Sequence, residues 1–406
     1  MYWTQNKKME KLISFQDNLL RHLKSDFRRY LYDSISFGER MIAIKGIRGV
    51  GKTTMLLQYL KTQNLNKSLY VTADHPWFYT KNLLDTADEW HKMGGRLLII
   101  DEVHKYKAWS SELKNIYDGF PDMQIIFTAS LALDIYRGEA DLSRRVFSYS
   151  LHGLSFREYL IINKIASFKT YSLTELLMNH RAIASEIIEQ IESPLRYFKA
   201  YLRHGYLPFG LVKGNEQDYL TRVFQIIDAC LAYDLAFIND YSAEHQSKIK
   251  RLLGILSETV PYIPNILELA TQLQIGRNTL LMLLQHLEQA SLINLINKTG
   301  KGFSALQKPD KITLENTNFC YALSNVPDEG SMRETFFVNQ LRNAGYTVEV
   351  ADTADYLIDG KITVEIGGKS KKKKQIKAIN DAFIIKDNIE TGVGNVVPLW
   401  LFGFLY

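Results

Sequence analysis

Short apolar runs alternate with helical patterns through the first 150 residues of the chain. Five of these apolar runs fit buried strands: Met41–Lys45, Ser68–Asp74, Arg96–Asp101, Met123–Thr128 and Arg145–Ser150. Parallel strands that are covered on both faces are apolar throughout rather than alternating. Strands separated by helices in this way predict an α/β fold with a parallel sheet covered on both sides.

The alternation of strand and helix stops at Leu154–Leu160, and the next ninety or so residues are mainly helical in pattern. Apolar positions recur every three or four residues in Leu173–Ile191 and Tyr219–Phe237. His204–Gly210 interrupts them with two glycines and a proline. This block is predicted to be a helical lid or linker that carries no chemistry of its own.

A helix-turn-helix pattern follows after a further helix at Ser247–Leu256. Asn265–Leu273 and Arg277–Glu288 have helical periodicity and are separated by a three-residue turn that contains Gly276. Leu292–Leu306 is expected to form a β-wing. The pattern is typical of a winged-helix domain.

The second helix of this pair would enter a DNA groove if the domain binds DNA. Arg277, Asn278 and Gln285 would then face the bases. The helix carries few basic residues, however, and winged helices also serve as packing modules between domains. Both interpretations stay open.

The last segment predicts a helix from Met332, then strands at Thr347–Val350, Ala354–Ile358 and Lys361–Ile366. It is expected to form a small α/β domain.

Three acids in this segment could bind a divalent metal for phosphodiester cleavage. They are Glu334 on the helix, with Asp355 and Glu365 on or near consecutive strands. Nucleases of this shape place a lysine two residues after the last acid, where this chain has Gly367, and Lys369 is the nearest substitute. The expected site is therefore a degenerate nuclease site.

A lysine-rich stretch follows, with six lysines between Lys369 and Lys377. It could contact a nucleic-acid backbone, or it could be a solvated turn.

Gly46 to Thr53 have the spacing GxxxxGK[ST] between an apolar strand and a helical pattern. Such a loop wraps phosphates with backbone N–H groups, and the following helix points its positive end at them. Lys52 would reach the β- and γ-phosphates, and the Thr53 hydroxyl would bind Mg²⁺. The expected nucleotide-binding residues are Gly46, Ile47, Arg48, Gly49, Val50, Gly51, Lys52, Thr53 and Thr54.

Two acids end the strand at Arg96–Asp101. Ligands of parallel sheets bind at the carboxyl ends of strands, so Asp101 would hold Mg²⁺ through water and Glu102 would polarise the attacking water. A structural alternative is that both acids cap the next helix. Adjacent acids here are typical of the NTPase branch in which one further strand lies between the loop strand and the acidic strand.

Polar residues at the end of the next strand are candidates for sensing the γ-phosphate. Thr128 is the first choice and Ser130 the second, although ordinary strand-end hydroxyls would look the same. Arg144 and Arg145 could supply positive charge to the transferring phosphoryl group, in cis or in trans, or could be surface charge. Arg48 is a weaker candidate for this role.

Composition supports a folded protein of several domains. The chain has 406 residues, of which 46% are hydrophobic and 23% charged, which rules out disordered and low-complexity classes. No apolar run is long enough to span a membrane, and the polar N-terminus does not suggest a signal peptide, so a cytoplasmic location is expected. Cys230 and Cys320 cannot form a disulfide framework. The net charge of +5 decides nothing about nucleic acid.

With these motifs, the chain resembles a prokaryotic group of AAA-type ATPases with a C-terminal restriction-endonuclease-like domain. The resemblance rests on Gly46–Thr53, Leu98–Glu102, Thr128–Ser130, Leu154–Leu160 and Val364–Lys369, together with the winged helix. It implies ATP rather than GTP, and it implies the roles given above for the loop and for the two acids. The chain departs from the pattern in its Thr-Ala-Ser sequence and in the missing lysine after Glu365.

The expected domains are residues 1–160 (P-loop ATPase), 161–245 (helical lid or linker), 246–325 (winged helix) and 326–406 (endonuclease-like α/β domain). The leading functional hypothesis is a Mg²⁺-dependent ATPase that acts as a conformational switch for its C-terminal modules. An ATP-gated DNA nuclease and a nucleotide-dependent DNA-binding regulator are the alternatives. No membrane partner is expected, and a homo-oligomer is left open.

Overall fold

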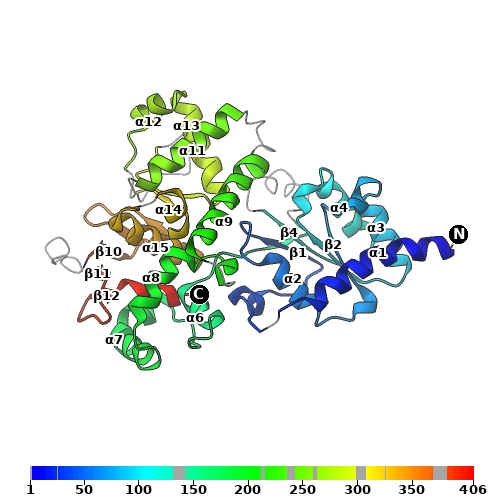
Figure 1. Ribbon diagram of the computed structural model, residues 1–406, viewed down its shortest axis with the longest axis horizontal. Coiled ribbons are helices and arrows are strands. Elements are labelled where there is room, and N and C mark those ends of the chain that lie inside the picture. Colours follow the sequence, from blue (N-terminus) through cyan, green and yellow to red (C-terminus); the bar gives the residue numbers. More distant parts are fainter. Residues whose placement is uncertain are drawn as a thin grey trace. The chain divides into compact units, whose positions relative to one another are not determined.

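The protein is described here by a computed structural model, which divides it into two compact units (Figure 1). Unit 1 is Met1–His152 and unit 2 is Gly153–Tyr406. The predicted domains 161–245, 246–325 and 326–406 all fall within unit 2, and their separate boundaries stay predictions. The structure describes residues 2–24, 26–130, 142, 144–211, 215–235, 243–258, 263–298, 308–324, 326–368 and 382–406.

Unit 1 contains a five-stranded sheet in which every neighbouring pair is parallel, in the order β2-β3-β4-β1-β5. The predicted α/β class is confirmed, and β4 lies between β1 and β3, as expected from the adjacent acids. All five carboxyl ends therefore face one edge of the sheet. The strands are β1 (Met41–Lys45), β2 (Ser68–Thr72), β3 (Leu97–Asp101), β4 (Gln124–Ala129) and β5 (Phe147–Ser150).

Helices cover this sheet because its central strands are apolar on both faces. Ile42, Leu98 and Ile125 are fully buried, and such strands need a layer on each side. The first helix also protects the edge strand, since the Gln16 side chain accepts a hydrogen bond from the Tyr70 backbone N–H at 2.7 Å. The helices are α1 (Tyr2–Arg21), α2 (Lys52–Leu60), α3 (Leu83–Lys92) and α4 (Trp109–Gly119).

Unit 2 begins with helices, as the periodicity predicts. The first of them starts with a capping box, in which the Ser155 hydroxyl and the Glu158 carboxylate each accept a backbone N–H of the other residue. Predicted ends agree with the structure within a few residues, and Phe237 lies outside the described residues. The helices are α6 (Phe156–Ile162), α7 (Leu173–Gln190), α8 (Pro194–His204), α9 (Glu216–Ala229), a π-helix (Cys230–Leu235), α11 (Ala243–Glu258), α12 (Ile266–Leu273), α13 (Arg277–Gln289), α14 (Thr317–Leu323) and α15 (Glu329–Asn343).

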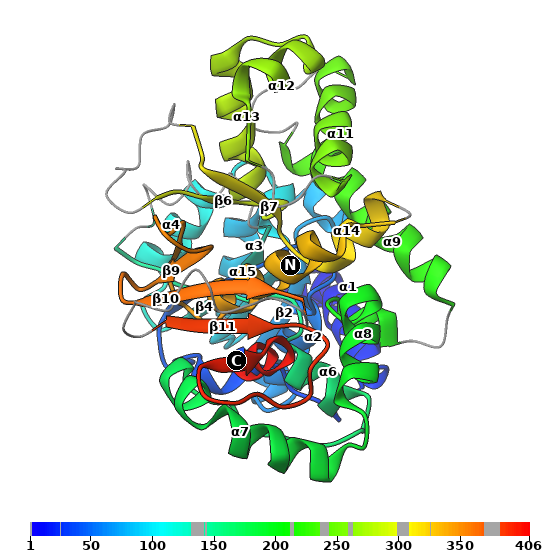
Figure 2. The same ribbon diagram turned by 90° about the vertical axis from the view of Figure 1, so that its left-hand side faces the viewer.

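Two sheets complete unit 2 (Figure 2). A two-stranded antiparallel sheet follows α13, and its second strand lies beyond the predicted wing at Leu292–Leu306. A five-stranded sheet has the order β12-β11-β10-β9-β8, with β10, β11 and β12 parallel. The strands are β6 (Ile293–Ile296), β7 (Lys311–Leu314), β8 (Val348–Glu349), β9 (Tyr356–Ile358), β10 (Ile362–Gly367), β11 (Ala382–Lys386) and β12 (Val396–Pro398).

A buried polar network joins the helices and sheets of unit 2. Glu315, directly after β7, accepts hydrogen bonds from the Tyr206 hydroxyl at 2.7 Å and from the Asn339 amide at 2.9 Å. Burial raises the pKa of Glu315 to about 7. Because β7, the loop after α8 and α15 all contribute, segments that the sequence suggests as separate domains share one core.

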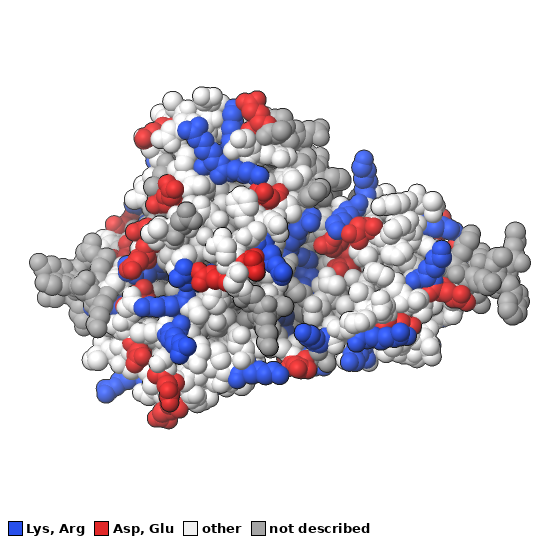
Figure 3. Space-filling model, viewed as in Figure 1, with Lys and Arg blue, Asp and Glu red and all other residues white. Residues whose placement is uncertain are grey.

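The surface shows no strong electrostatic bias in the view of Figure 3, where basic and acidic side chains are interspersed. Among the described residues, no helix is long and apolar enough to cross a membrane. Cys230 and Cys320 are both buried, and neither forms a disulfide.

Candidate functional site

The loop between β1 and α2 has a backbone that requires glycine at several positions. Gly49 and Gly51 have φ values of 83° and 98°, which residues with a Cβ rarely adopt. A Cβ on Gly46 would lie 2.5 Å from the carbonyl oxygen of Leu151. The Lys52 ammonium donates to the carbonyls of Gly46 at 2.7 Å and Ile47 at 3.1 Å. The loop is thus a narrow cradle with its lysine lying across it.

Arg29 braces this cradle from the segment before β1, a contact that sequence reasoning missed. Its guanidinium donates to the carbonyl of Val50 in the loop and to that of His152 at 2.7 Å. The residue is only 5% exposed. Burial, together with the Arg29 charge, lowers the pKa of His152 to about 4. A fixed cation therefore connects the loop with the chain beyond β5.

Asp101, at the end of β3, accepts hydrogen bonds from three hydroxyl groups. Thr53 in the loop donates at 2.6 Å and Tyr70 on β2 at 2.8 Å, and Thr128 on β4 donates to the other carboxylate oxygen. Hydroxyl groups orient a carboxylate without neutralising it. The Thr53 hydroxyl and the Asp101 carboxylate are also hard oxygen ligands of the kind that Mg²⁺ prefers. The residues at this edge of the sheet therefore fit a magnesium site.

Glu102 has a strained backbone and a tethered side chain. Its φ of 52° places it in the left-handed region, where non-glycine residues are uncommon and cluster at functional sites. Its carboxylate forms an ion pair with Lys105, whose ammonium also contacts Asp74 at 2.6 Å. Partial burial would lower the pKa of Lys105, but hydrogen bonds to Asp74 and Glu102 raise it. Lys105 is thus shared by two carboxylates.

Thr128 lies between the two acids. Its hydroxyl donates to Asp101 and accepts from the backbone N–H of Glu102 at 2.8 Å. Ser130 lies one residue beyond β4, and its N–H donates to Nδ1 of His104 at 3.2 Å. The geometry therefore favours Thr128 over Ser130 as the residue that couples the strand end to Glu102.

The structure separates Arg144 and Arg145 from the phosphate loop. Arg145 precedes β5, whose first residue, Phe147, pairs with Ile42 on β1, so its backbone lies roughly 20 Å along the sheet from Gly46 in the loop. Its guanidinium donates to Asp118 at 3.0 and 3.1 Å. Arg144 is exposed beside it. The predicted role of Arg144 and Arg145, in cis or in trans, stays a prediction. Arg48, in contrast, lies in the loop and is partly buried.

The predicted acidic trio of unit 2 is not arranged as a metal site. Glu334 and Asp355 lie on either side of Lys311, which belongs to β7, and Glu365 is buried on β10. Among the described residues, no group of three or more His, Cys, Asp or Glu side chains could hold a metal ion. Lys369 and the Lys369–Lys377 patch lie outside the described residues.

The helix-turn-helix pair is present as α12 and α13. Gln274 in the turn has a φ of 53°, and Gly276 caps α13. Arg277 and Asn278 are exposed, whereas Gln285 is half-buried. Two of the three expected contact residues are therefore accessible.

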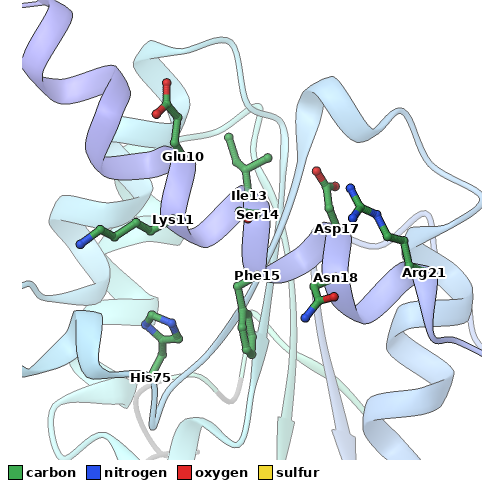
Figure 4. Close-up of a pocket in the computed structure, with 9 residues that line it drawn as sticks. All are labelled: Glu10, Lys11, Ile13, Ser14, Phe15, Asp17, Asn18, Arg21 and His75. Atoms are coloured by element: carbon green, nitrogen blue, oxygen red, sulfur yellow. The ribbon is translucent and has the colours of Figure 1, made fainter.

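An open groove of about 560 Å³ runs along α1 (Figure 4). The Phe15 and His75 rings contact each other edge-on at 5.2 Å on one side of it. The groove is lined by Glu10, Lys11, Ile13, Ser14, Phe15, Asp17, Asn18, Arg21 and His75. None of these residues belongs to the phosphate loop.

The β1–α2 loop and the acids Asp101 and Glu102 all lie within one segment that matches a known domain family. Residues 38–160 match the family model described as an AAA domain. Over most of its length the chain is also similar to the uncharacterized protein MJ1637 of Methanocaldococcus jannaschii, with 27% identity over 90% of this chain and 85% of that protein.

Solved structures with partial similarity have low identities and TM-scores. C. elegans PCH-2 is 18% identical (TM-score 0.25, 40% of this chain and 46% of that chain). AMPPCP-bound DnaA from Aquifex aeolicus is 14% identical (TM-score 0.24, 64% and 84%). A DNA replication initiation factor is 16% identical (TM-score 0.26, 61% and 80%). With TM-scores this low, none of them bears on function.

Proposed function

We propose that unit 1 binds ATP with Mg²⁺ and hydrolyses it. One observation carries the proposal: the Thr53 hydroxyl and the Asp101 carboxylate lie 2.6 Å apart directly after a loop whose Gly49 and Gly51 have positive φ values. A glycine-rich loop, a lysine and two oxygen ligands are the combination that a triphosphate with its cation requires. The match of residues 38–160 to the AAA domain model supports the same conclusion.

Each residue has a distinct role in this proposal. The loop amides and Lys52 bind the phosphates, and Thr53 and Asp101 would hold Mg²⁺, which when bound neutralises charge on the transferring phosphoryl group. Glu102 orients the attacking water and accepts its proton. Thr128 keeps Glu102 beside Asp101 through its two hydrogen bonds.

Hydrolysis would serve as a conformational switch. Lys52 exchanges carbonyl partners for phosphate when nucleotide binds, and Glu102 must leave Lys105 before it can take a proton. Both changes occur at the carboxyl edge of the sheet. Changes in the segments that face the γ-phosphate are a known way to signal the nucleotide state to other modules.

The test compares nucleotide binding and phosphate release for four full-length proteins. Lys52→Ala should abolish the binding of fluorescent ATP, whereas Glu102→Gln should retain it and lose roughly 100-fold or more in phosphate release. Lys61→Ala, at the other end of α2, is the matched control and should behave like wild type. Equal ATP affinity for wild type and Lys52→Ala would contradict the proposal.

A nucleotide-dependent DNA-binding role is the second candidate, and the exposed Arg277 and Asn278 on α13 favour it. It predicts an affinity for duplex DNA that falls steeply with salt and weakens in Arg277→Ala. A mobility shift that is unchanged in Arg277→Ala would count against α13 as the reading helix.

A further inference from the structure

Lys311 joins two carboxylates that come from different parts of unit 2. Its ammonium lies 3.1 Å from Oε2 of Glu334 on α15 and 3.8 Å from Oδ1 of Asp355, which precedes β9. The lysine side chain is only 11% exposed. The ammonium also lies 4.4 Å from the centre of the Tyr356 ring, a distance typical of cation–π contacts.

Other donors hold the two carboxylates from their far sides. The Tyr356 hydroxyl donates to Oε2 of Glu334, and the backbone N–H of Ile366 on β10 donates to Oδ2 of Asp355 at 2.8 Å. Burial raises the pKa of Glu334, and the charge of Lys311 opposes that rise. The carboxylates are thus arranged around the ammonium group.

We propose that Lys311 is the resident cation of this acidic cluster and takes the place of a divalent metal ion. A divalent ion needs several oxygen ligands at 2.0–2.6 Å around it, and here the ammonium group already lies between the two available carboxylates. Glu365 does not complete a ligand set, because no metal-binding group of three exists among the described residues. The cluster therefore neutralises its charge from within the chain.

This assignment changes the role of the C-terminal sheet. Phosphodiester cleavage at an acidic trio depends on the bound metal, and the Lys311 ammonium competes with such an ion for the carboxylates of Glu334 and Asp355. Lys311 thereby ties β7 to α15 and to the start of β9.

Binding of Mn²⁺, measured by electron paramagnetic resonance on the full-length protein, tests the proposal. Asp101→Asn serves as the background, so that the metal site of unit 1 does not contribute. That protein should bind no Mn²⁺ in unit 2, and adding Glu334→Gln should leave its Mn²⁺ titration unchanged. Mn²⁺ bound by Asp101→Asn and lost on Glu334→Gln would overturn the proposal.

Thermal unfolding gives an independent readout in the otherwise wild-type chain. Lys311→Met should lower the melting temperature by roughly 5 °C or more, because it leaves two partly buried carboxylates without their cation. Lys298→Met is the matched control, since Lys298 pairs with Asp352 at 3.2 Å on the surface, and it should change the melting temperature little. Equal melting of the two variants would contradict the proposal.

A variant that retains the charge covers the case in which Lys311→Met does not fold. Lys311→Arg should fold and bind no Mn²⁺ in the Asp101→Asn background, since a guanidinium also neutralises the carboxylates. Mn²⁺ binding by Lys311→Arg that Glu334→Gln removes would overturn the proposal.

Discussion

The two units each place acidic side chains beside a sheet, and Asp101 in unit 1 differs from Glu334 and Asp355 in unit 2 in the groups that contact its carboxylate. In unit 1, Asp101 accepts from the hydroxyls of Thr53, Tyr70 and Thr128, which orient it but leave its charge. In unit 2, Glu334 and Asp355 face the ammonium group of Lys311. A carboxylate that accepts hydrogen bonds only from neutral donors keeps its negative charge and can bind a cation. A lysine beside a carboxylate neutralises that charge within the chain. The groups that donate to an acidic cluster thus indicate whether it can bind a cation, which the acids alone do not.

The largest expected effect is a difference in the rate of ATP hydrolysis between variants that lack one acid of either cluster. Asp101→Asn should lower the rate of ATP hydrolysis at least about 100-fold, because it removes a preorganised charge from the phosphate site. Asp355→Asn should leave that rate unchanged, because its cluster holds no nucleotide in our proposal. Phosphate release at saturating ATP and Mg²⁺ measures both variants. A similar loss in both would break the distinction between the clusters.

The pH dependence of stability should have opposite signs in the two units. The pKa of Glu315 is raised to about 7 in the folded protein, which therefore binds the proton more tightly than the unfolded chain does. The free energy of unfolding of unit 2 should therefore fall as the pH rises from about 4.5 to 7. The pKa of His152 is lowered to about 4, so stability in unit 1 is lost as the pH falls from about 6.5 to 4. Urea unfolding over this pH range should therefore show two opposing trends.

Glu315→Gln isolates the contribution of unit 2. The variant should remove a loss on the order of 2 kcal/mol between pH 4.5 and 7. Glu192→Gln is the control, because Glu192 is exposed, and it should retain the wild-type pH dependence. If the slope of Glu315→Gln matches that of wild type, Glu315 is not the group that titrates.

The sequence predicts the loop, the acids and the one strand between β1 and β3, because each prediction depends on residues that are close along the chain. Lys52 and Thr53 follow their strand directly, and Asp101 and Glu102 end theirs. The contacts that organise these residues come from elsewhere: Tyr70 is 31 residues from Asp101. No local pattern marks such a partner, and only the register of β2 beside β3 brings it into place.

Unit 2 was harder to predict for the same reason. The acids Glu334 and Asp355 are visible as a pattern, but Lys311 lies 23 residues before Glu334, on another strand. The strands β11 and β12 were not predicted. The first follows a lysine-rich stretch, and the second is three residues long, too short to show a periodicity.

Lys105 offers a smaller effect that sharpens the description of unit 1. It is shared by Glu102 and Asp74, so the two carboxylates compete for one ammonium group. Lys105→Met should free Glu102 and raise ATP hydrolysis about two- to fivefold, the range expected for a partly exposed ion pair. Asp74→Asn should instead lower the rate of ATP hydrolysis, because Lys105 then pairs with Glu102 alone. Changes of the same sign in steady-state phosphate release would rule out competition.

The smallest expected effect concerns the hydroxyl of Tyr70. Tyr70→Phe removes one of the three donors to Asp101 and retains the buried ring, so it should lower the free energy of unfolding by about 1 kcal/mol. The Asp101 carboxylate would keep its charge but lose part of its orientation. The Mg²⁺ concentration that gives half-maximal ATP hydrolysis should therefore rise a few-fold, while ATP binding without metal stays unchanged.

Tyr356→Phe makes the same chemical change in unit 2, where the hydroxyl donates to Glu334. It should cost similar stability and leave the Mg²⁺ dependence as in wild type, because Lys311 still neutralises its cluster. If both variants alter the Mg²⁺ dependence alike, hydroxyl donors do not distinguish a cation site from a neutralised one.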